Sequence, residues 1–119
     1  MSRTRASAKK AGAAFERAMA DYLAEQLGDD RIDRRVKSGA KDRGDIAGLR
    51  VFGERGVVEC KNTRAMTLAA WINEAEVEAG NDDARHWVVV HKRRGVGAPG
   101  EQYVTMTVDQ WLWLMRGGQ

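Results

Sequence analysis

The chain has 119 residues, of which 43% are hydrophobic and 31% are charged, and its formal net charge is +3. These values describe one globular domain with a modest core and exclude an intrinsically disordered chain. No apolar run approaches the roughly 20 residues that a membrane span needs. The N-terminus lacks the apolar region of a signal peptide, and the single cysteine excludes an internal disulfide. We therefore expect no membrane association and a cytoplasmic location.

The charges are unevenly distributed along the chain. Basic residues gather in segments 1–10, 37–43 and 92–94, whereas acidic residues gather in segment 74–83. Segregation of this kind indicates a face that attracts a polyanion, most commonly nucleic acid. A basic tail with ordinary solvated loops would give the same distribution, so charge alone does not decide between the two.

The first part of the chain predicts a helix, a strand and a loop. Residues 1–8 are expected to form a flexible basic arm, and apolar residues recur at helical spacing over 9–27. Alternating apolar and charged residues predict a strand over 31–36. The basic segment 37–44, which contains two glycines, predicts a loop.

Strand and helix patterns alternate over the remainder of the chain. The elements predicted there are a β-hairpin over 45–52 and 57–61, a helix over 67–79, strands over 85–92 and 102–108, and a helix over 109–115. Thr67 is the expected N-cap of the middle helix, and Glu74, Glu76 and Glu78 are expected to lie largely off its apolar face. The β-branched run over 86–91 is typical of a strand buried on both faces.

This order of elements predicts an α/β sandwich around one mixed sheet, with 86–91 as the interior strand. The chain shows no internal repeat and no linker long enough to divide it, so residues 9–119 are expected to form a single domain.

The predicted hairpin places charged residues among apolar ones. Glu59 and Lys61 are two residues apart, so their side chains leave the same face of the strand, and Cys60 points to the other face. Asp45 lies on the neighbouring strand, but a two- or four-residue turn would send Asp45 and Glu59 to opposite faces. A shared site therefore requires a three- or five-residue turn or a β-bulge, which the glycines of segment 52–56 can supply.

The first helix shows the same conflict between charge and burial. At about 100° per residue, Glu16 projects into the apolar sector, whereas Arg17, Asp21 and Glu25 fall on the opposite side. Burying an unpaired charge costs several kcal/mol, so such groups are normally paired or bound to a metal.

A divalent cation would offset that cost. Asp45 and Glu59 are hard oxygen ligands, and the backbone carbonyl of Cys60 and several waters would complete the octahedron that Mg²⁺ prefers. Lys61 adds a positive charge for a substrate phosphate. These groups together predict phosphodiester hydrolysis. Each group has a simpler explanation. Glu59 and Lys61 could form an exposed ion pair, Glu16 could lie at the edge of the apolar face with its carboxylate in water, and Asp45 could belong to a turn. Their joint occurrence in this order favours a site.

The same residues resemble the PD-(D/E)XK nuclease superfamily and, within it, the archaeal-type Holliday junction resolvases that phages also carry. The matching residues are Gly12, Phe15, Glu16 and Arg17 on the helix, Lys37, Ser38 and Gly39 in the loop, Gly44, Asp45 and Ile46 in the hairpin, and Glu59, Cys60 and Lys61 on its second strand. The resemblance covers roughly residues 9–92, and Gly44 stands where the superfamily motif has proline.

The resemblance implies a restriction-endonuclease-like core of order α-β-β-β-α-β, with one mixed sheet flanked by helices. It implies that Asp45 and Glu59 bind Mg²⁺, for which Mn²⁺ substitutes. Lys61 would be catalytic, and Glu16 would complete the metal site through a bound water. The expected DNA contacts are Arg17, Lys37, Ser38, Lys41 and Arg43. A homodimer acting on branched DNA in a bacterial, archaeal or phage-infected cell is also implied.

The leading interpretation is a Mg²⁺-dependent endonuclease that resolves four-way junctions. The alternatives are a restriction- or repair-type nuclease acting on duplex or flap DNA, a non-catalytic DNA-binding domain of the same fold, and an unrelated α/β interaction protein. The last predicted helix carries more apolar surface than one buried stripe needs, and we expect the excess to lie in the dimer interface. The residues concerned are Trp111, Leu112, Trp113, Leu114 and Met115.

Overall fold

The computed structural model describes residues 4–36 and 39–119 of the chain. Over these residues it contains three α-helices and a mixed sheet of six strands, which confirms the predicted α/β class. The helices are α1 (Arg5–Leu27), α2 (Leu68–Asn81) and α3 (Val108–Met115), with a 3₁₀ turn, η1, at Pro99–Glu101. The strands are β1 (Asp33–Arg34), β2 (Ile46–Ala47), β3 (Arg50–Val51), β4 (Glu54–Lys61), β5 (His86–His91) and β6 (Tyr103–Thr105). None of the described helices is both long and apolar enough to span a bilayer.

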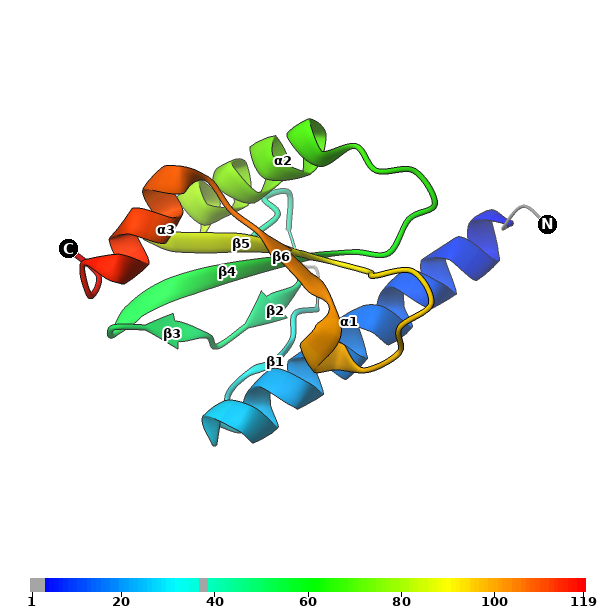
Figure 1. The fold of residues 1–119 in the computed structure, drawn as a ribbon, viewed down its shortest axis with the longest axis horizontal. Coiled ribbons are helices and arrows are strands. Elements are labelled where there is room, and N and C mark those ends of the chain that lie inside the picture. Colours follow the sequence, from blue (N-terminus) through cyan, green and yellow to red (C-terminus); the bar gives the residue numbers. More distant parts are fainter. Residues whose placement is uncertain (1–3, 37–38) are drawn as a thin grey trace.

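The sheet lies between α1 and α2 (Figure 1). Its strands follow the order β1-β2-β4-β5-β6, and β3 also pairs with β4. Only β4 and β5 run parallel among the described pairs, and α2 provides the crossover that a parallel pair requires. Every residue of β5 is buried, which confirms that 86–91 is an interior strand.

Two clusters of buried apolar side chains form the core, one on each face of the sheet. The α1 face consists of Phe15, Met19, Ala20, Ile32, Ile46, Val58, Cys60, Val88 and Val90. The α2 face consists of Val57, Trp71, Ala75, Ala79, Trp87 and Val89. Because successive strand residues point to opposite faces, Glu59 and Lys61 share the α2 face with Val57, whereas Cys60 lies on the α1 face.

A β-bulge in the hairpin sets which residues of β2 and β4 face each other. Two residues, Gly48 and Leu49, lie between β2 and β3, and the single residue Gly56 faces them on β4. The extra residue changes the register so that Ile46 pairs with Val58. Of the predicted alternatives, a three- or five-residue turn or a bulge, the structure has the bulge, but the predicted position in segment 52–56 is wrong.

The conformations of two glycines explain this arrangement. The hairpin closes with a two-residue turn at Phe52 and Gly53, both with positive φ, as tight hairpin turns require. The bulge lies at Gly48 because this residue has φ +86° and its Cα packs against the backbone of Arg31. A Cβ atom at Gly48 would lie 2.1 Å from the carbonyl oxygen of Arg31.

Several predicted boundaries differ from the structure. Helix α1 begins at Arg5 because the Thr4 hydroxyl caps it by accepting a hydrogen bond from the Ser7 amide, so the expected arm 1–8 is helical from residue 5. Helix α2 continues through Gly80, since the left-handed conformation that follows the helix is taken by Asp83. The strands predicted over 31–36 and 102–108 are shorter, at β1 and β6.

Candidate functional site

The hairpin brings Asp45 and Glu59 together from separate strands. Asp45 directly precedes Ile46 of β2, which pairs with Val58, and its amide donates a 3.0 Å hydrogen bond to the Val58 carbonyl oxygen, next to Glu59. The Asp45 Oδ2 atom accepts a 2.8 Å hydrogen bond from the Cys60 amide. Asp45 is 7% exposed and Glu59 is 4% exposed. The two carboxylates therefore lie close enough to interact, and their role as a shared site stays a prediction.

The environment of this pair disfavours two negative charges. Burial, and then the adjacent Glu59, raises the pKa of Asp45 to about 7. Burial also raises the pKa of Glu59 to about 7. In addition, Glu59 Oε1 is buried and has no hydrogen-bond donor among the described residues. An orphaned buried oxygen beside a second carboxylate fits a hard divalent cation, which would supply the missing positive charge.

Lys61 lies beside the pair and carries a positive charge. Its Nζ atom is 3.7 Å from Glu59 Oε2 and 2.7 Å from Glu74 Oε2 of α2. Burial disfavours the ammonium form, but the contacts with Glu74 and Glu59 outweigh it and raise the pKa of Lys61. Lys61 is therefore an ammonium group at neutral pH. It can stabilise negative charge and orient an oxygen, but it cannot accept a proton.

Glu16 reaches the site from the other helix layer. Its carboxylate accepts a 2.9 Å hydrogen bond from Arg34 Nε. Burial, and then the charge of Asp45, raises the pKa of Glu16, which shows that Glu16 and Asp45 lie close enough to interact. A cavity of about 360 Å³ has both residues in its wall, together with Lys9 and Gly12 of α1. This cavity gives ligands access to the Asp45 carboxylate from the α1 side.

The predicted DNA-contacting residues have different surroundings. Arg17 is exposed, but it forms ion pairs with Asp21 and Asp33. Lys37 and Ser38 lie outside the described residues. Lys41 and Arg43 are exposed on the 39–44 loop, which contains no helix or strand.

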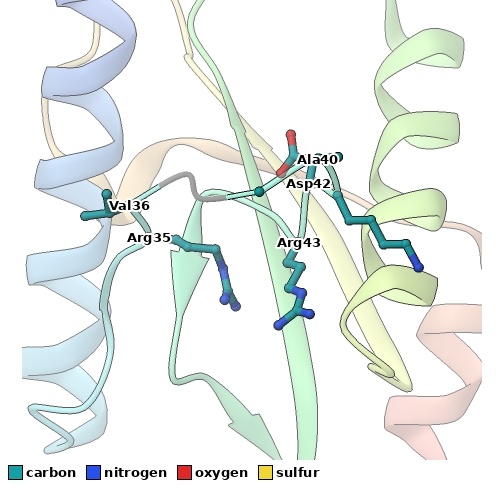
Figure 2. A pocket seen from close by; sticks show the side chains of 7 residues that line it. Arg35, Val36, Ala40, Asp42 and Arg43 are labelled. Carbon is teal, nitrogen blue, oxygen red and sulfur yellow. The ribbon is translucent and has the colours of Figure 1, made fainter.

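This loop borders a cavity of about 460 Å³ (Figure 2). The guanidinium groups of Arg35 and Arg43 point to the same side of the loop in this view, whereas the Asp42 carboxylate points to the other side. The Arg35 guanidinium also forms a 3.5 Å ion pair with Asp82. Arg43, on this side of the loop, is therefore the better placed of the two arginines to contact an anionic ligand.

The sequence analysis missed two acidic residues near the pair. Glu78 is buried, so the prediction that it lies off the apolar face of α2 is wrong. It follows Trp71 by seven residues and Ala75 by three, a spacing that places all three on one helical face and that could have identified it. Asp42 and Glu78 each place a carboxylate oxygen within 4.8 Å of Glu59 and of each other. No pattern in the sequence indicated Asp42.

No family model matches the chain, and no similar curated protein or solved structure was found. Function is therefore inferred from the residues and their geometry.

Proposed function

We propose that this chain is a Mg²⁺-dependent DNA endonuclease of the PD-(D/E)XK type that cuts four-way junctions. The observation that carries the proposal is the register of the hairpin, in which Ile46 pairs with Val58, so that Asp45 lies near Glu59, and Lys61 lies beside Glu59. The order α1, β1, β2–β3, β4, α2, β5 also agrees with a restriction-endonuclease-like core and supports the proposal.

The side chains divide the work of phosphodiester hydrolysis. Asp45 and Glu59 would hold the cation, with the carbonyl of Cys60 and, through a bound water, Glu16. When bound, the cation polarises the phosphate and acidifies a water molecule. Lys61, held as an ammonium, would stabilise the negative charge that develops on the phosphate and orient the attacking water.

Basic residues around the site supply affinity for the DNA backbone. Lys9 contributes to the cavity that contains Asp45, and Arg35, Lys41 and Arg43 border the cavity beside the 39–44 loop. Contacts of this kind give salt-dependent affinity that is largely independent of sequence. Selectivity for a four-way junction would then come from its shape, read by two copies of the chain.

The second copy would cover an exposed apolar surface on β6 and α3. Its exposed residues are Tyr103, Val104, Val108, Trp111 and Met115. Trp113 of the same helix is buried against His86 and Phe52, so only part of the apolar surface of α3 is used within one chain. A homodimer through this surface would present two sites to the opposed strands of a junction.

A cleavage assay tests the chemistry and the substrate together. The substrates are a mobile four-way junction, a linear duplex and a flap, each with titrated Mg²⁺ or Mn²⁺. We expect preferential cutting of the junction and a loss of at least about a hundredfold in Asp45→Asn and Lys61→Ala, with junction binding retained. Asp30→Asn, at an exposed acid after α1, is the matched control and should cut normally.

The other outcomes each contradict part of the proposal. Preferential cutting of duplex or flap would indicate a restriction- or repair-type nuclease. Junction binding without cutting in either metal would indicate a non-catalytic binding domain. Absence of DNA affinity at low salt would reject a nucleic-acid function.

A further inference from the structure

Glu78 of α2 is buried without a hydrogen-bond donor. It is 3% exposed, and neither of its carboxylate oxygens has a hydrogen-bond partner among the described residues. The Glu59 Oε1 atom is also buried without a hydrogen-bond partner among these residues. The two carboxylates lie on the same side of the sheet, where α2 packs on β4. A buried carboxylate is normally compensated by donors, so these orphaned oxygens indicate a ligand.

Asp42 completes a cluster of three carboxylates. Asp42, Glu59 and Glu78 each supply one oxygen, and these oxygens lie within 4.8 Å of one another. The Gly44 amide donates a 2.9 Å hydrogen bond to Asp42 Oδ1. The Asn81 side chain donates a 2.7 Å hydrogen bond to the Asp42 carbonyl oxygen. The loop is therefore tied to the end of α2 in a position that directs Asp42 towards the two glutamates.

A cavity borders the cluster on the α2 side. It has a volume of about 540 Å³ and is lined by Asp42 and by Glu74, Glu78, Asn73 and apolar residues of α2. In Figure 2 the guanidinium groups of Arg35 and Arg43 point to the side opposite the Asp42 carboxylate. Lys61 is the cation beside Glu59, but its shorter contact is with Glu74. Arg35 forms its ion pair with Asp82, and Lys61 with Glu59 and Glu74, and among the described residues neither oxygen of Glu78 has a hydrogen-bond donor.

We propose that Asp42, Glu59 and Glu78 form a binding site for a hard divalent cation, which shares Glu59 with the Asp45 site. Three carboxylates from a loop, a strand and a helix match the oxygen ligands that Mg²⁺, Mn²⁺ and Ca²⁺ require. A cation bound there would fasten the 39–44 loop to β4 and α2. The site binds metal in the free protein, so the proposal does not depend on nuclease activity.

The alternative is that the carboxylates share a proton. Burial raises the pKa of Glu78 to about 8, so a carboxylic acid could donate to a neighbouring carboxylate at neutral pH. A shared proton would satisfy part of the cluster without any metal. Direct measurement of metal binding distinguishes the two arrangements.

The test is a Mn²⁺ titration of the protein without DNA, followed by electron paramagnetic resonance. Asp45→Asn is the starting variant, because it weakens the site of the proposed nuclease and leaves the cluster intact. We expect this variant to bind one Mn²⁺ and to gain thermal stability from it. Adding Glu78→Gln or Asp42→Asn should lower the affinity at least tenfold and remove the gain. Adding Glu76→Gln, an exposed acid of the same helix, should change neither.

Three results would overturn the proposal. In the first, the Asp45→Asn variant binds no Mn²⁺ at millimolar concentration. In the second, the double variants bind as tightly as the single one. In the third, Glu76→Gln lowers affinity as much as Glu78→Gln, so that only net charge matters. Asp42 lies outside the core, so its variant remains informative if Glu78→Gln impairs folding. A protein that binds Mn²⁺ at the cluster but cuts no DNA would retain this proposal and reject the nuclease.

Discussion

Replacing Gly48 with alanine tests whether a close backbone contact sets the register of the hairpin. The positive φ of Gly48 costs an alanine about 1–2 kcal/mol. Its Cβ would also lie 2.1 Å from the Arg31 oxygen and 2.7 Å from the Arg31 carbonyl carbon. These are backbone atoms that cannot rotate away, and relieving such a clash costs about 1–3 kcal/mol more. The expected loss is about 2–5 kcal/mol, a large share of the roughly 5–15 kcal/mol of a typical domain.

Gly53→Ala is the matched control for this substitution. Gly53 also has positive φ, but no atom lies within 4 Å of the position of its missing Cβ. Only the conformational cost of about 1–2 kcal/mol therefore applies. Urea unfolding followed by tryptophan fluorescence gives both free energies of unfolding. Equal losses for Gly48→Ala and Gly53→Ala would refute the reasoning, because the contact with Arg31 would then contribute nothing.

Two further predictions concern charge and assembly. The pKa of Glu78 is raised, so at intermediate pH the folded chain keeps a proton on this carboxyl that the unfolded chain has lost. In the presence of a chelator, the free energy of unfolding of the wild-type chain should therefore fall as pH rises from about 5 to about 8. Glu78→Gln cannot ionise, so its free energy of unfolding should rise relative to wild type by on the order of 1 kcal/mol per pH unit in urea titrations; a constant difference would contradict the buried charge. Light scattering at micromolar concentration should show a dimer that Trp111→Ser converts to a monomer and that Leu27→Ser, an exposed site on α1, leaves intact. A wild-type monomer would reject the interface on β6 and α3.

Local patterns in the sequence were sufficient to predict the helices, the interior strand and the pair of carboxylates. The alternation of side chains along a strand was enough to show that a hairpin with a two- or four-residue turn and no bulge would send Asp45 and Glu59 to opposite faces. It could not locate the bulge. The position of the bulge depends on Gly48 packing against Arg31, a contact between segments that no local pattern joins.

The errors at the site have the same origin. The sequence-based prediction places Glu78 largely off the apolar face of its helix, although the spacing from Trp71 puts it on that face, where acidic residues seldom lie. The pairing of Lys61 with Glu74 and of Glu16 with Arg34 arises only when helices and strands pack together. Sequence patterns predict which face a side chain leaves, but its partner depends on the tertiary structure.

The carboxylates form one connected row rather than separate pairs. Glu16 interacts with Asp45, Asp45 with Glu59, Glu59 with Glu78, and Glu78 with Asp42, and the row passes from the α1 layer to the α2 layer. Within each pair, the carboxylate nearer to Asp42 raises the pKa of the other. Neutralising a carboxylate therefore makes ionisation easier for the neighbour on its Glu16 side. Glu59 belongs to both the Asp45 site and the cluster with Asp42 and Glu78. A cation bound by Asp42, Glu59 and Glu78 would consequently change the ionisation of Asp45.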